Sequence, residues 1–65
     1  MYRELLGEMV KCGLTREELA KQIGVSEKTL FNKLNGATDF SWTEVKAIRD
    51  IVAPDYQLET LFKCN

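Results

Sequence analysis

The stretch that decides the fold is REELAKQIGVSEKTLFNKLNG, residues 16–36. Its apolar positions predict a short helix over 16–23 and a second from Glu27 to about Asn35. Gly24 lies in the three or four residues between them, and such a turn is typical of a helix-turn-helix. Two helices that cross steeply need a small residue at their contact, and Ala20 has the right size. The stretch therefore predicts a helix-turn-helix.

Three helix starts are specified by local chemistry. Thr15 and Glu18 form a capping box, in which a hydroxyl and a carboxylate satisfy the free N–H groups of the first turn. Ser41 and Glu44 repeat that spacing, and apolar residues flank both boxes as hydrophobic staples. Ser26 supplies a cap without a carboxylate three residues later. We therefore expect helices to begin just after these residues.

The rest of the chain also reads as helical. An apolar stripe predicts a first helix that ends at Gly13, made by Tyr2, Leu5, Leu6, Met9 and Val10. A fourth helix should stop before Pro54, and a short final helix should lie around Gln57–Lys63. Phe31 is expected on the inner side of its helix, and Trp42 is expected to be partly buried. We predict one all-α domain over residues 1–65.

Composition argues against several classes of function. The chain has two cysteines and no histidine, which removes the common zinc spacings and histidine-dependent catalysis. We expect a partly buried Cys12 and a terminal Cys64, both as free thiols, and neither an enzyme nor a cofactor or metal site. No apolar run could span a bilayer and the charged N-terminus is unlike a signal peptide, so a cytoplasmic protein without membrane contact is expected.

The charge distribution is uneven. Residues 1–36 carry six basic and five acidic side chains, whereas residues 37–65 carry three basic and five acidic ones. The chain as a whole has a net charge of −1, although nucleic-acid binders usually have a basic face. The uneven distribution between residues 1–36 and 37–65 is compatible with a weakly basic face and an acidic face behind it, but it does not require that arrangement.

The chain resembles the phage-repressor-like (Cro/CI, or XRE-type) helix-turn-helix domains, in particular their short phage or prophage branch. The resemblance is carried by Leu14-Thr15, Glu18-Leu19-Ala20, Ile23-Gly24-Val25-Ser26, Leu30, Leu34-Asn35-Gly36 and Phe40. It implies a compact five-helix, lambda-repressor-like domain whose helices 2 and 3 form the helix-turn-helix. It also implies a homodimer, expected to be weak, that binds double-stranded DNA at a palindromic operator and represses transcription.

The resemblance implies roles for individual residues. The base-reading positions of the family fall on Glu27, Lys28 and Asn32, and Thr29 beside them is a further candidate for base contact. The phosphate-holding positions fall on Arg16, Asn35, Thr38 and the backbone N–H groups around Phe40, with Lys33 and Lys46 as further candidates. The chemistry permits base reading, since Lys can donate to guanine, Asn can pair with adenine and Glu can accept from cytosine. The alternative interpretation is that these side chains are ordinary solvated helix residues.

Two departures from the family pattern affect the expected affinity. Arg16 stands where the family often has glutamine, which should strengthen a phosphate contact. Asp39 lies in a loop that is often basic, and Glu27 brings a carboxylate to the groove, so both should weaken binding. A protein-interaction module that kept the fold but lost DNA binding, or an antitoxin that combines both activities, is the alternative. No small-molecule substrate is expected.

Overall fold

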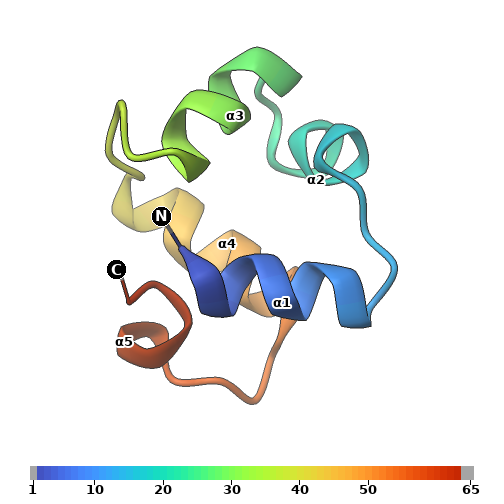
Figure 1. Cartoon of the computed structure of the whole chain (residues 1–65), viewed down its shortest axis with the longest axis vertical. Helices are drawn as coiled ribbons and strands as arrows, with labels where there is room; N and C mark the ends of the chain where they lie inside the picture. The colour runs from blue at the N-terminus through green and yellow to red at the C-terminus, as the bar shows by residue number, and fades with distance from the viewer. Residues whose placement is uncertain (1, 64–65) are drawn as a thin grey trace.

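The computed structural model describes residues 2–63, and within them the backbone forms five helices and no strand. Figure 1 shows the helices wrapped around a common centre, with α4 passing behind α1. The helices are α1 Arg3–Lys11, α2 Arg16–Ile23, α3 Glu27–Leu34, α4 Trp42–Val52 and α5 Leu58–Leu61. The predicted all-α class is confirmed, and the Cα atoms have a radius of gyration of 10.4 Å.

The predicted caps are present where helices α2 and α4 begin. Thr15 Oγ1 accepts the Glu18 N–H at 3.1 Å, and Glu18 Oε1 accepts the Thr15 N–H at 3.1 Å. Ser41 and Glu44 make the same reciprocal pair at 3.1 and 2.8 Å. Each cap is worth about 1 kcal/mol, a sizeable part of the stability of a small domain.

The connection between α2 and α3 is short because Gly24 reverses the chain. Its φ of 80° lies in the left-handed region, which residues with a Cβ atom rarely adopt. The N–H groups of Gly24 and Val25 both donate to the carbonyl of Ala20, at 2.9 and 3.0 Å. Ser26 then caps α3 by accepting the Thr29 N–H at 3.1 Å. The two helices pack against each other across this turn.

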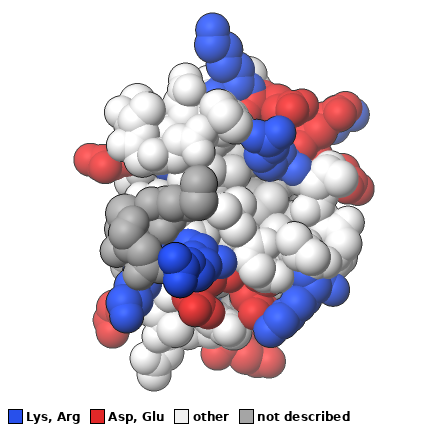
Figure 2. All heavy atoms as spheres, viewed as in Figure 1, with Lys and Arg blue, Asp and Glu red and all other residues white. Residues whose placement is uncertain are grey.

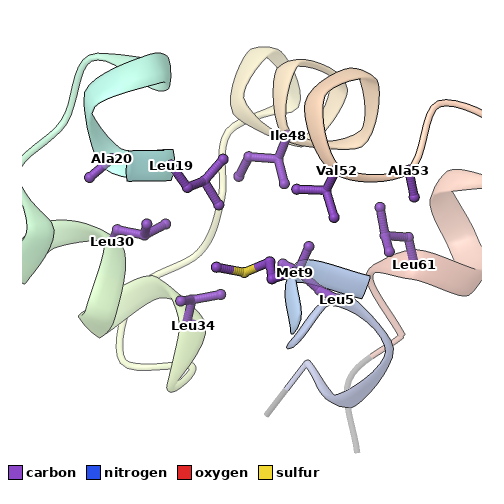
Figure 3. Packing of buried hydrophobic residues seen from close by; sticks show 10 residues of the cluster. All are labelled: Leu5, Met9, Leu19, Ala20, Leu30, Leu34, Ile48, Val52, Ala53 and Leu61. Atoms are coloured by element: carbon purple, nitrogen blue, oxygen red, sulfur yellow. The ribbon is translucent and has the colours of Figure 1, made fainter. Parts of the chain in front are cut away.

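Every helix contributes one fully buried aliphatic side chain to a single core. The five are Leu5, Leu19, Leu30, Ile48 and Leu61, each with 0% exposure. Met9, Ala20, Leu34, Val52 and Ala53 complete the core, and Figure 3 shows these ten side chains converging between the helices. Burying one large aliphatic side chain contributes about 1.5–3 kcal/mol, so each helix is held by its own anchor.

Two contacts close the domain around its ends. The rings of Tyr2, Phe40 and Phe62 meet edge to face, with centroids 5.3–5.9 Å apart, and join the N-terminus to the segment before α4 and the end of α5. The hydroxyl of Tyr56 donates to Glu8 Oε2 at 3.1 Å, which links the loop after α4 to α1.

Several apolar residues are more exposed than the sequence predicts. Val10 is 80% and Trp42 66% exposed, because each is turned roughly 100–120° around its helix from the buried line, given about 100° per residue. Phe31, expected on the inner side, is 45% exposed for the same reason. Cys12 is exposed rather than partly buried, while Cys64 lies outside the described residues. Helix α5 covers only Leu58–Leu61 of the expected 57–63.

Candidate nucleic-acid interface

Helix α3 has one anchored face and one face open to solvent. Leu30 and Leu34 are 0% and 3% exposed and fix the inner face in the core. Glu27, Lys28 and Phe31 are exposed on the side of the helix that does not enter the core, and Asn32 is half-buried beside them. At about 100° per residue these four side chains fall within an arc of roughly 140°. The sequence-predicted positions 27, 28 and 32 therefore share one face of one rigid helix.

Thr29 differs from the other predicted base-reading residues. Its N–H donates to Ser26 Oγ, and its hydroxyl oxygen accepts a hydrogen bond from the Ser26 hydroxyl at 2.8 Å. The side chain is exposed, but its oxygen is engaged in the cap of α3. Thr29 thus takes the place that a carboxylate holds in the other two caps.

Arg16 lies beside the open face of α3 because α2 begins there. Its guanidinium carbon is 4.8 Å from the centroid of the Phe31 ring, a cation–π distance. Arg16, Glu27, Lys28 and Phe31 together line a shallow, open hollow between α2 and α3. The structure therefore brings one predicted phosphate contact next to two predicted base contacts, and it adds Phe31, which sequence reasoning assigned to the core.

Lys33 has a different environment from the one expected of a phosphate contact. Its ammonium lies 2.8 Å from Glu44 Oε1 and donates to the carbonyl of Asp39 at 3.2 Å. The two charged side chains are only 15% and 17% exposed. The Lys33 ammonium and then the Ser41 N–H hold the pKa of the Glu44 carboxyl below its ordinary value of 4.5. Lys33 thus ties α3 to the beginning of α4 in this structure.

The remaining predicted phosphate contacts are dispersed. Asn35 is the C-cap of α3, and both it and Thr38 are exposed in the loop that leads to α4. Phe40 is half-buried, with its ring in the aromatic cluster of Tyr2 and Phe62, so only its backbone could meet a ligand. The Lys46 ammonium lies 5.9 Å from the centroid of the Trp42 ring. No hydrogen bond or ion pair joins these residues to the hollow.

Charges of both signs are mixed over the surface that carries α1. Figure 2 shows Lys and Arg side chains next to Asp and Glu side chains there, without a continuous patch of one sign. On α1 itself, Lys11 pairs with Glu8 at 3.0 Å, and on α4 Arg49 pairs with Asp50 at 2.8 Å. Among residues 2–63, by contrast, neither Glu27 nor Lys28 is ion-paired.

The chain matches no protein-family model, no curated protein and no solved structure. Across the described part of the chain, no helix has the length and apolar character needed to cross a membrane. Residues 2–63 also contain no group of three or more acidic or cysteine side chains placed to hold a metal ion.

Proposed function

We propose that α2, the turn at 24–26 and α3 act as a helix-turn-helix that binds duplex DNA sequence-specifically, with α3 in the major groove. The observation that carries this proposal is the division of α3 into a buried face and an open face. The open face combines the carboxylate of Glu27, the ammonium of Lys28 and the amide of Asn32. Within residues 2–63, neither Glu27 nor Lys28 has a charged partner. A rigid helix with free hydrogen-bonding groups on one side suits base-edge recognition.

Each group on that face has a specific role in the proposal. Lys28 donates to guanine O6 or N7, Asn32 pairs with the N6 and N7 atoms of adenine, and Glu27 accepts from cytosine N4. Arg16, at the first position of α2, contacts a phosphate beside the groove. Asn35 and Thr38, exposed in the loop after α3, contact the DNA sugar-phosphate backbone on the other side of the groove. Lys33 is left out of the proposed contacts because its ammonium is already bonded to Glu44.

The biological role proposed is transcriptional repression of the phage or prophage type, by a weak homodimer on a palindromic operator. Two copies of α3 would then enter successive major grooves on one side of the duplex. Their half-sites should be centred about one DNA turn, roughly 34 Å, apart. The resemblance to phage-repressor-like domains supports this arrangement.

Selection of the purified chain on random duplexes at low salt, followed by binding of the winners across a salt series, tests the proposal. A palindromic consensus bound with an affinity that falls as salt rises is expected. Lys28→Ala should reduce this affinity, whereas Lys63→Ala, an exposed lysine after α5, should leave it unchanged. An unenriched pool without salt-dependent binding would contradict DNA recognition.

A protein-interaction module, or an antitoxin-like partner with weak or no DNA binding, is the second candidate. The net charge of −1 and the 66% exposure of Trp42 favour it, because tryptophan is enriched at the centres of protein interfaces. The two candidates differ in salt dependence, since a mainly apolar interface lacks the counterion release that accompanies phosphate contacts.

A further inference from the structure

Phe31 occupies the middle of the open face of α3. It follows Glu27 by four residues and Lys28 by three, spacings that place side chains next to one another on a helix. The same three residues and Arg16 line the hollow between α2 and α3. With 45% of its surface exposed, the ring of Phe31 is an apolar group surrounded by groups suited to polar recognition.

The Arg16 guanidinium holds this ring in place. Its central carbon lies over the ring at 4.8 Å from the centroid, so one side of the ring is covered by a cation. The rest of the ring remains available on the open face. A stacked, planar side chain loses little further freedom when it makes a contact, since its position is already constrained.

We propose that Phe31 is a specificity-determining residue that contacts the 5-methyl group of a thymine. This inference depends on the proposed function, because it places Phe31 in the major groove. The thymine methyl is the apolar group that base edges present there, and phenylalanine is one of the side chains that pack against it. The neighbouring cation Arg16 matches a phosphate beside the groove, and Lys28, which also lines the hollow, is placed to read an adjacent guanine. One thymine in each half-site is therefore read by its methyl group.

Deoxyuridine tests this contact because it lacks only the methyl group. Each thymine of the selected duplex is replaced in turn by deoxyuridine, and binding of the unmodified chain is measured. One position per half-site should weaken binding about fourfold, the effect of removing one buried methyl group. Phe31→Ala should bind the thymine and deoxyuridine duplexes equally well. Trp42→Ala, which removes an exposed aromatic ring outside α3, should retain the fourfold difference.

The outcomes separate this inference from the proposed function. Equal affinity of the unmodified chain for all deoxyuridine duplexes would refute the methyl contact while leaving DNA binding intact, and this result requires no variant. A fourfold difference that persists in Phe31→Ala, or a selected site without thymine, would refute it as well. If no duplex is selected, DNA binding itself fails, and the methyl contact fails with it.

Discussion

Replacing Lys33 by methionine would show whether this residue holds the fold together or binds phosphate. Its ammonium lies 2.8 Å from Glu44 Oε1, and the two side chains are 15% and 17% exposed. Exposed ion pairs contribute about 0–1 kcal/mol, whereas hydrogen bonds to charged groups contribute about 1.5–3 kcal/mol. A short and largely covered pair lies between these ranges, so a coupling free energy of about 1.5 kcal/mol is expected.

A double-mutant cycle of Lys33→Met and Glu44→Gln measures that coupling. Glutamine retains an oxygen that can accept the Ser41 N–H, and methionine retains the apolar part of the lysine side chain. Urea unfolding of the four proteins gives the coupling free energy, and thermal unfolding of Lys33→Met should show a decrease of about 6–12 °C.

The control is Lys21→Met. Its ammonium is 3.9 Å from Glu17, and the two side chains are 79% and 67% exposed, so the change should cost no more than about 0.5 kcal/mol. If Lys33→Met costs no more than this control, the structural role argued for Lys33 is wrong. DNA binding of Lys33→Met is measured separately across a salt series. A decrease of about 0.9 in the salt slope would show that Lys33 contacts a phosphate, as the sequence predicts.

Four other substitutions have defined outcomes. The pKa of the Glu44 carboxyl is lowered in the folded state. The ionised carboxylate therefore stabilises the fold above the ordinary pKa of 4.5, and this contribution is lost as pH falls through the folded-state pKa. In acid unfolding, Glu44→Gln should accordingly lose stability less steeply than the unmodified chain. Arg16→Ala should weaken binding to all duplexes about equally in filter binding, whereas Asn32→Ala should cost about 1–3 kcal/mol on the specific site and relax the preference at one base pair. Leu30→Ala should reduce the free energy of unfolding in urea by about 2–5 kcal/mol because Leu30 is fully buried.

The parts of the fold predicted from sequence are those that local chemistry specifies. The bounds of α2 match the prediction because Thr15 begins the helix and Gly24 ends it, each through bonds within four residues. The exposure of Phe31 and Trp42 was predicted wrongly, because it depends on which side of each helix meets the core. The buried line of α3 runs through Leu30 and Leu34, and that spacing alone could have shown that Phe31 points away from it.

The same distinction applies to the candidate interface. Positions 27, 28 and 32 were predicted together because the resemblance to phage-repressor-like domains implies base-reading roles there, and helical periodicity is compatible with one shared face. The partner of Lys33 was not predicted, since Glu44 is 11 residues further along the chain and meets it only after α3 and α4 have packed. Phe31 entered the interface only when the position of Arg16 at the start of α2 was known. Contacts between helices are the part that sequence periodicity leaves undetermined.

The cations at the hollow between α2 and α3 limit how the proposed interface could achieve specificity. Arg16 and Lys28 are the two cations that line the hollow, and Glu27 beside them carries the opposite charge. Phosphate neutralisation, which supplies most non-specific affinity, is therefore limited. In the proposed complex, directional bonds from Asn32 and Lys28 and an apolar contact from Phe31 would distinguish one base pair from another, whereas phosphate contacts would not. Under the proposed function, such a binder would gain selectivity by giving up affinity for DNA in general, which is compatible with a net charge of −1.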